Sequence, residues 1–295
     1  MKFWVGCTFL PPEVLLDVAK FADDAGFYGA FLSDHPAFPE QIDTPYPYSA
    51  DGKMGFDHTI PYPDAWIAIA AMAAVTEKLH FSTNVFIAAA RHPLVVAKAL
   101  STAAVLSNNR VALGLAAGWM REEFAAMDQD FSTRGRRLDE SIEIYRALWA
   151  GGFVEHHGTY YDFPRLKVSP APTAPIPIYC GGISDAAVKR AATLCDGWIG
   201  TLQDDEQLRQ FVAKLDRARE EFGRAKDPNF EVFGGVSGPP SVDAYRRLED
   251  AGVTSTTVAP WHLAPSDEGF TPDRMKRAIE SFAETIVSKF PSDQS

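Results

Sequence analysis

The stretch IPIYCGGISDAAVKRAATLCDGWIGT, residues 176–201, decides the fold of this chain. Its first apolar run meets two glycines, Gly181 and Gly182, and Ser184 then opens an alanine-rich segment with helical spacing. A second apolar run follows at residues 198–201. This order predicts a strand, a glycine turn, a helix with a serine cap and a further strand.

The glycine turn and the capped helix also predict an anion site. The first N–H groups of a helix have no intrahelical partner and carry the positive end of its dipole. Glycines such as Gly181 and Gly182 let an anion approach the backbone, so a phosphate is the expected occupant. Thr201 ends the next strand, where its hydroxyl could reach the same anion. The alternative is that the glycines only make a tight turn and that Ser184 only caps the helix.

The same alternation of strand-length apolar runs and helix-length amphipathic segments continues through the whole chain. The predicted strand–helix pairs are 2–9 with 12–25, 28–33 with 63–75, 79–86 with 92–106, 110–116 with 121–149, 176–179 with 184–194, 197–201 with 204–222, 230–236 with 241–251, and 255–259 with 272–289. Near-continuous apolar strands imply a parallel sheet covered by helices, and eight such units close a (β/α)8 barrel, the TIM barrel. A doubly wound open sheet is the alternative, but no G-x-G-x-x-G motif follows the first strand.

We therefore expect one α/β domain over residues 1–295, a TIM barrel with two insertions. The first insertion, residues 35–62 after the second strand, is rich in Pro, Tyr and Phe and belongs to the face on which such barrels carry their active sites. The second, residues 151–175 before the fifth strand, leaves from the opposite face, and we expect a small hairpin with a proline tail there. It serves either as a structural excursion or as a subunit contact. The helical segment after the fourth strand is expected to break near residues 131–133.

Composition and charge exclude several classes of function. The 295 residues are 46% hydrophobic, enough for one large core, and the net charge of −11 comes without a Lys/Arg cluster that could hold nucleic acid or an anionic membrane surface. The cysteines Cys7, Cys180 and Cys195 have neither disulfide nor zinc spacing, which indicates a reducing compartment. No apolar segment approaches the roughly 20 residues that a membrane span needs, and no signal-peptide pattern opens the chain. We expect a cytoplasmic protein.

Polar residues at the ends of the predicted strands are the candidates for chemistry. The second strand ends in Ser33, Asp34 and His35, and an aspartate beside a histidine predicts an imidazole held in one tautomer for proton transfer. The alternative is that Asp34 caps a loop and that His35 is structural. No metal site is expected, because no H-x-H or H-E-x-x-H spacing occurs. Glu122 and Glu123 are interpreted as helix-surface residues or partners of the helix dipole.

Small residues at two further strand ends leave room for a flat molecule. The fourth strand ends in Ala116, Ala117 and Gly118, followed by Trp119, and the segment Ala88–Ala90 follows the third strand. Beside the predicted anion site, these positions describe a slot for a planar, phosphorylated cofactor.

Taken in order, several segments resemble the bacterial luciferase-like superfamily, and within it the branch of deazaflavin (coenzyme F420)-dependent oxidoreductases. The segments that carry the resemblance are residues 33–35, 83–93, 113–124, 134–149 and 179–198. The resemblance runs from about the first strand to the sixth and fades after Thr201. It implies a (β/α)8 barrel with insertions, in agreement with the count of strand–helix units.

The resemblance also assigns roles by position. Asn84 and Val85 fall where the family often has a non-prolyl cis peptide behind the cofactor ring, and His35 matches a catalytic histidine near that ring. The cofactor-binding positions that the match implies are Asp34, Asn84, Val85, Ala116, Ala117, Gly118, Gly181, Gly182, Ile183, Ser184 and Thr201. The expected walls of the substrate pocket are Phe38, Trp119 and Trp261. The sugar-phosphate dehydrogenases of the branch instead have a glutamate at the Trp119 position and a tryptophan near Pro39, so sugar-phosphate oxidation is disfavoured here.

These features lead to an expected function with alternatives. The resemblance implies an oxidoreductase that transfers a hydride between a small organic substrate and bound coenzyme F420, in a chain that often forms a homodimer in this family. One alternative is an FMN-dependent two-component monooxygenase, and another is a flavin- or deazaflavin-binding protein without turnover. A lyase or aldolase that holds its substrate's phosphate ranks last, because no predicted strand end carries a lysine.

Overall fold

Eight parallel strands form the barrel in the computed structural model, which describes residues 1–49, 51–55, 58–200, 204–225, 227–263 and 268–290. The barrel strands are β1 (Lys2–Gly6), β2 (Gly29–Leu32), β3 (His80–Thr83), β4 (Leu113–Leu115), β7 (Ile178–Gly181), β8 (Gly197–Ile199), β9 (Glu231–Phe233) and β10 (Ser255–Val258). They pair in the order β3-β2-β1-β10-β9-β8-β7-β4, and the bridges Phe81–Val111 and Phe86–Leu115 join β3 to β4 and close the barrel. The predicted TIM barrel is confirmed.

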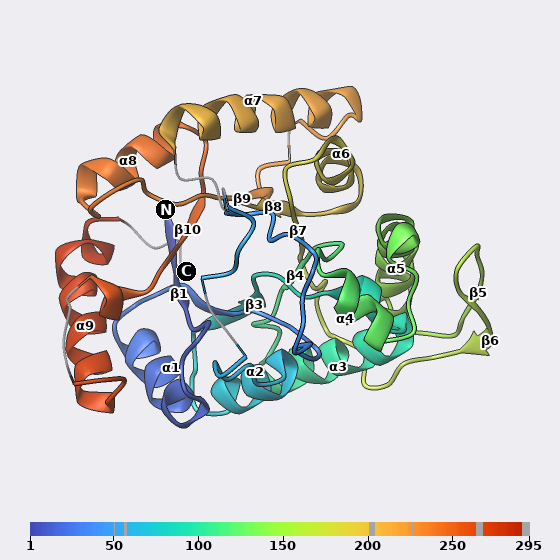
Figure 1. Ribbon diagram of the computed structural model, residues 1–295, viewed down its shortest axis with the longest axis horizontal. Helices are drawn as coiled ribbons and strands as arrows, with labels where there is room; N and C mark the ends of the chain where they lie inside the picture. Colours follow the sequence, from blue (N-terminus) through green and yellow to red (C-terminus); the bar gives the residue numbers. More distant parts are fainter. Residues whose placement is uncertain (50, 56–57, 201–203, 226, 264–267, 291–295) are drawn as a thin grey trace.

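The helices form a ring around the strands (Figure 1). They are α1 (Leu15–Asp24), α2 (Ala65–Ala73), α3 (Pro93–Leu106), α4 (Arg121–Ala126), α5 (Arg134–Trp149), α6 (Asp185–Leu194), α7 (Asp205–Glu221), α8 (Val242–Asp250) and α9 (Pro272–Thr285). Short 3-10 turns lie at η1 (Pro12–Val14), η2 (Ala88–Ala90), η3 (Phe131–Thr133), η4 (Pro260–His262) and η5 (Val287–Lys289). As predicted, the helical segment after the fourth strand breaks at η3 into α4 and α5.

Large aromatic side chains fill the inside of the barrel. Trp4 stacks on Phe31 with ring centroids 4.5 Å apart, and Tyr179, Ile199 and Phe233 complete the same buried cluster. The strands of a parallel barrel are buried on both faces, so their side chains are removed from water. Because these aromatic rings bury a large apolar area, they contribute a large share of the hydrophobic stabilisation. The second and larger core cluster packs the outer faces of the strands against the helices.

The two insertions differ in structure. The insertion before the fifth barrel strand is the predicted hairpin, an antiparallel pair of β5 (Val154–His157) and β6 (Asp162–Leu166) that stands outside the helix ring (Figure 1). The insertion after β2 has no helix or strand in the part that the structure describes. None of the described helices is both long and apolar enough to cross a membrane.

Candidate functional site

The carboxyl ends of the strands bring predicted cofactor residues together. A Cβ atom on Gly181, at the end of β7, would lie 3.0 Å from Val85 Cγ1 and 3.4 Å from Ala116 Cβ, so these three positions are immediate neighbours. The peptide bond between Asn84 and Val85 is cis, as the resemblance implied. A cavity of about 170 Å³ opens at the same strand ends, lined by Asn84, Ile199, Gly200, Phe233, Gly234, Gly235 and Thr257. The centre of the barrel mouth is therefore hollow, and three glycines are among the residues that line it.

The N-terminus of α6 opens on this same face. Ser184 caps the helix by accepting a hydrogen bond from the Ala187 N–H at 3.3 Å, and Gly182 has a φ of +107°, in the region that favours glycine. Ile183 and Ser184 are exposed, and no described residue pairs with the N–H groups of Asp185 and Ala186. An anion could therefore reach two free helix N–H groups, and the arrangement fits a phosphate. Thr201, the last residue predicted for this site, lies outside the described residues.

The acidic side chain at this helix mouth is neutralised. Asp185 accepts a hydrogen bond from Lys214 of α7 at 2.5 Å, and this contact lowers the pKa of Asp185. The carboxylate therefore adds little net repulsion to an approaching anion. On the other side of the turn, Trp198 Nε1 donates to the Gly182 carbonyl at 2.8 Å and holds the glycine pair in place.

Asp34 holds the loop after β3 and does not pair with His35. Its carboxylate binds both terminal nitrogens of Arg91 at 2.7 Å and accepts the Ile87 N–H at 3.0 Å. The side chains of Asp34 and Arg91 are 3% and 16% exposed, so the pair is buried. The hypothesis that Asp34 orients His35 is wrong, because the Asp34 carboxylate binds Ile87 and Arg91 of the loop around η2.

The partner of His35 is Glu123, which the sequence interpretation placed on a helix surface. His35 Nδ1 lies 3.1 Å from Glu123 Oε1, and the Glu123 side chain is fully buried. That interpretation was wrong because Glu123 lies on the apolar face of the helix, which Met120, Phe124 and Met127 define by their spacing. This face packs against the core, so the carboxyl group is buried. A carboxyl group on an apolar face is rarely buried without a partner, so this spacing could have identified the residue.

Aromatic rings surround His35. The ring centroids of Phe38, Tyr62 and Trp119 lie 5.0, 5.2 and 6.4 Å from that of His35, and Tyr46 packs against Trp119 at 5.1 Å. Burial raises the pKa of Tyr62, so its hydroxyl stays protonated. The predicted pocket residues Phe38 and Trp119 thus lie beside the predicted catalytic histidine. They form an apolar wall around its imidazole.

Three other predicted residues have different surroundings. Gly118, with a φ of +86°, packs so closely on Phe124 that a Cβ atom there would lie 2.6 Å from the Phe124 ring, and Ala117 precedes it in the same turn. Trp261 is 1% exposed and lines a separate cavity of about 630 Å³ against α9. No other predicted site residue lines that cavity, so nothing in the structure joins Trp261 to His35.

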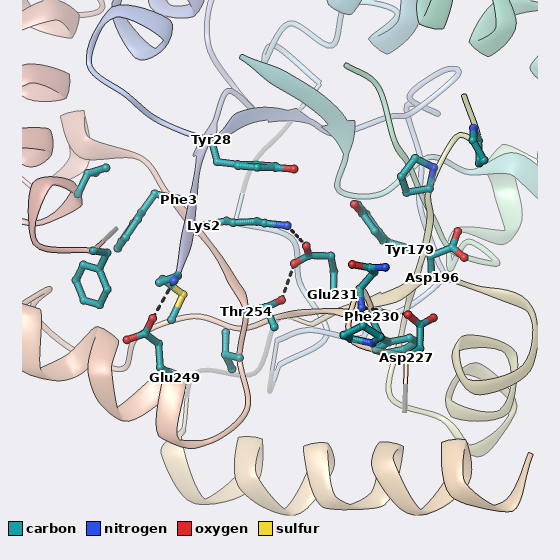
Figure 2. Close-up of a pocket in the computed structure, with 18 of the residues that line it drawn as sticks. Lys2, Phe3, Tyr28, Tyr179, Asp196, Asp227, Phe230, Glu231, Glu249 and Thr254 are labelled. Atoms are coloured by element: carbon teal, nitrogen blue, oxygen red, sulfur yellow. Dashed lines mark hydrogen bonds and ion pairs between the residues drawn. The ribbon is translucent and has the colours of Figure 1, made fainter. Parts of the chain in front are cut away.

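A larger cavity, about 810 Å³, lies at the amino ends of the strands, the end of the barrel opposite to the one that carries His35. Figure 2 shows residues that line this cavity. Lys2 pairs there with Glu231, whose other carboxylate oxygen accepts from Thr254 at 2.6 Å and Ser255 at 2.9 Å. Figure 2 shows Lys2, Glu231 and Thr254 directed at one another beneath the ring of Tyr28. Because the polar groups satisfy each other, and the amino ends of TIM-barrel strands serve stability, size alone does not identify the site. In the described part of the chain, no three His, Cys, Asp or Glu side chains are grouped to hold a metal ion.

The chain is similar in sequence to several known proteins. An uncharacterised protein of Mycobacterium tuberculosis (strain ATCC 25618 / H37Rv) is 38% identical over 278 residues, which are 93% of this chain and 94% of that protein. The F420-dependent glucose-6-phosphate dehydrogenase of Microbacterium testaceum (strain StLB037) is 32% identical over 221 residues, 73% of this chain and 61% of that protein.

Among solved structures, an F420-dependent secondary alcohol dehydrogenase in complex with an F420-acetone adduct superposes with a TM-score of 0.76. It is 16% identical and the match covers 98% of this chain and 99% of that one, which shows a common fold. The profile of the luciferase-like monooxygenases matches residues 10–248. The chain therefore belongs to the luciferase-like monooxygenase family.

Proposed function

We propose that the protein is an oxidoreductase that transfers a hydride between an organic substrate and a bound deazaflavin of the F420 type. One observation carries the proposal: the open N-terminus of α6 and the residues around Gly181 share the barrel face that carries His35. A helix mouth for a phosphate, a floor of small residues and a buried histidine are what a phosphorylated planar cofactor requires. The F420 dependence of the Microbacterium testaceum relative supports the choice of cofactor.

Different residues of this chain would bind the cofactor, transfer a proton and exclude water. The N–H groups of Asp185 and Ala186 would bind the cofactor's phosphate, and Val85 and Ala116 would lie against its ring system. When bound, the deazaflavin supplies or accepts the hydride. His35 would exchange a proton with the substrate oxygen, and Phe38 would help to exclude water from the reacting groups.

The proposed substrate is an apolar alcohol or carbonyl compound. Trp119 and Phe38 face the imidazole of His35 with aromatic rings, and Trp119 packs on Tyr46. A sugar phosphate would place a hydroxyl-rich ring and a charge against this wall, which is unfavourable without polar partners. The substrate therefore differs from that named for the Microbacterium testaceum relative.

The test is cofactor binding to the purified protein. We expect oxidised F420 to bind with a fluorescence change and FMN to bind more weakly. The variant Ser184→Asp keeps a good helix cap but adds a negative charge at the phosphate, so the Kd should rise about tenfold or more. Ser241 is the matched control, because it caps α8 in the same way by accepting from Ala244 N–H at 3.2 Å.

The outcomes separate the alternatives. Ser241→Asp should leave the Kd within about twofold, since no proposed cofactor residue lies at that cap. An unchanged Kd in Ser184→Asp would remove the α6 mouth from the site. Preference for FMN, with oxygen consumed during turnover, would favour the two-component monooxygenase. Tight F420 binding without reduction or oxidation of any alcohol, aldehyde or enone would favour a protein that only stores the cofactor.

A further inference from the structure

One oxygen atom of Glu123 has no partner. Oε1 lies 3.1 Å from His35 Nδ1, but Oε2 is buried and has no hydrogen-bond partner among the described residues. A buried carboxylate with a bare oxygen has lost the solvation of its charge, and the cost of that loss is several times the cost for a neutral carboxyl group. The geometry therefore favours the protonated form of this side chain.

The charged neighbours do not reverse that preference. The groups that face Glu123 are His35, Asp34, Arg91 and the hydroxyl of Tyr62. The guanidinium of Arg91 is engaged by both carboxylate oxygens of Asp34, so its charge is already compensated. Burial raises the pKa of Glu123 and outweighs the contact with His35 and the charge of Arg91, which lower it, while the charge of Asp34 adds to the rise.

We propose that Glu123 carries a proton at neutral pH and donates it from Oε1 to His35 Nδ1, which fixes His35 as the tautomer with its N–H at Nε2. A hydrogen bond between a carboxyl group and an imidazole nitrogen contains one shared proton. In this assignment the proton is bound to the carboxyl oxygen, so Nδ1 is the acceptor. Among the described residues, the imidazole of His35 hydrogen-bonds through Nδ1 to Glu123, which leaves the Nε2 N–H available to a substrate oxygen. Glu123 is thus a positioning residue that acts through His35.

This assignment favours carbonyl reduction as the reaction that the resting site can begin, a consequence that rests on the proposed function. A resting Nε2–H is a proton donor, so the site is prepared to reduce a carbonyl compound. The hydride from a reduced deazaflavin would form the new C–H bond, and the Nε2 proton would pass to the carbonyl oxygen to complete the alcohol. Glu123 would then give its proton to Nδ1 and be left as a carboxylate. When Nε2 takes up a proton from water after the alcohol leaves, the Nδ1 proton would return to Glu123 and restore the resting state.

The direct test uses the protein without any cofactor. We expect nitrogen-15 NMR of the His35 ring, assigned with His35→Gln, to show the Nε2–H tautomer at pH 7. Glu123→Gln should keep that tautomer, because the amide N–H₂ also donates to Nδ1. The infrared band of a protonated carboxyl should be present in the wild type at pH 7 and absent in Glu123→Gln. An Nδ1–H tautomer in the wild type, or no such band, would overturn the proposal.

The kinetic test then addresses the direction. In single-turnover reduction of a carbonyl compound by reduced F420, Glu123→Gln should lower the rate about 100-fold, because no proton follows the one that leaves Nε2. The Kd for F420 should stay within about twofold, which a collapse of the site would not allow. Loss of less than about threefold would overturn the relay. If no carbonyl compound is reduced by wild-type protein, the proposed function fails, while the NMR and infrared results still decide the proton assignment.

Discussion

At the level of single residues, the site depends on polar side chains that are buried in pairs. Asp34 and Arg91 hold the loop that carries Ile87 and η2, and Glu123 holds the imidazole of His35. In each pair the partners come from different strand–helix units. A buried ionic group is tolerated only when its partner is present, so loss of either member of the Asp34–Arg91 pair leaves an uncompensated charge.

This pairing leads to a prediction for Asp34→Asn. The change leaves the buried charge of Arg91 without its carboxylate, so we expect the free energy of unfolding to fall by about 3 kcal/mol or more. Urea unfolding followed by circular dichroism measures it. Glu280→Gln is the control, because Glu280 lies 3.8 Å from Lys276 in an exposed pair and should cost no more than about 0.5 kcal/mol. Equal losses in the two variants would show that the Asp34 pair is not stabilising.

At the level of elements, α4 connects the long insertion to His35. Glu122 accepts hydrogen bonds from Asp43 N–H at 3.0 Å, Thr44 N–H at 2.9 Å and Thr44 Oγ1 at 2.8 Å. The next residue on the same helix binds His35, at the start of that insertion. A six-residue helix therefore fixes both the position of the imidazole and the wall above it.

We predict that Glu122→Gln loosens the insertion. A neutral amide accepts weaker hydrogen bonds than a carboxylate, so the amide protons of Asp43 and Thr44 should exchange with solvent about tenfold faster at pH 7. Hydrogen exchange followed by NMR measures this, and Glu143→Gln on the exposed face of α5 is the control. If exchange is unchanged, Glu122 does not hold the loop.

The same contact predicts a pH dependence. Burial works to raise the pKa of Glu122, but the hydrogen bonds from Thr44 and Asp43 outweigh it and hold the pKa below its ordinary value of 4.5. A carboxyl group with a lowered pKa contributes its full stabilisation above its ordinary value and loses it as the pH falls through the lowered one. After correction for intrinsic rates, exchange at Thr44 should therefore accelerate only below pH 4.5, and acceleration that begins near neutral pH would contradict this origin.

At the level of the whole molecule, barrel closure depends on a close approach of β3 and β4. A Cβ atom on Gly114 would lie 1.8 Å from the Thr83 carbonyl oxygen, and Thr83 Oγ1 donates to the Gly114 carbonyl at 2.6 Å. Only a residue without a side chain fits at this seam. We predict that Gly114→Ala opens it and lowers the free energy of unfolding by about 3 kcal/mol or yields insoluble protein.

A second glycine provides the matched control. Gly135 lies in the first turn of α5, where a Cβ atom would meet only Arg190 Nη2 at 3.5 Å, so Gly135→Ala should stabilise the protein by about 0.5 kcal/mol. Thermal unfolding of both variants gives the comparison. A stable, soluble Gly114→Ala protein would mean that the seam has room to shift.

The strand–helix units and the capped helix could be predicted because their causes are local. Apolar runs, glycine turns and the Ser184 cap act over a few residues, and each is visible in the order of amino acids. The contact between Glu123 and His35 could not be predicted in this way, because the two residues lie 88 positions apart along the chain. Nor could the pairing of Asp34 with Arg91, 57 positions apart.

The sequence by itself therefore determined a closed barrel of eight strand–helix units and a helix N-terminus suited to an anion, since hydrophobic periodicity and capping are properties of neighbouring residues. Only the tertiary structure decided that Glu123 contacts His35, that Asp34 forms an ion pair with Arg91, and that Trp261 packs against α9. These outcomes follow from how the strand ends converge, and a buried charge takes whichever partner that convergence brings within reach.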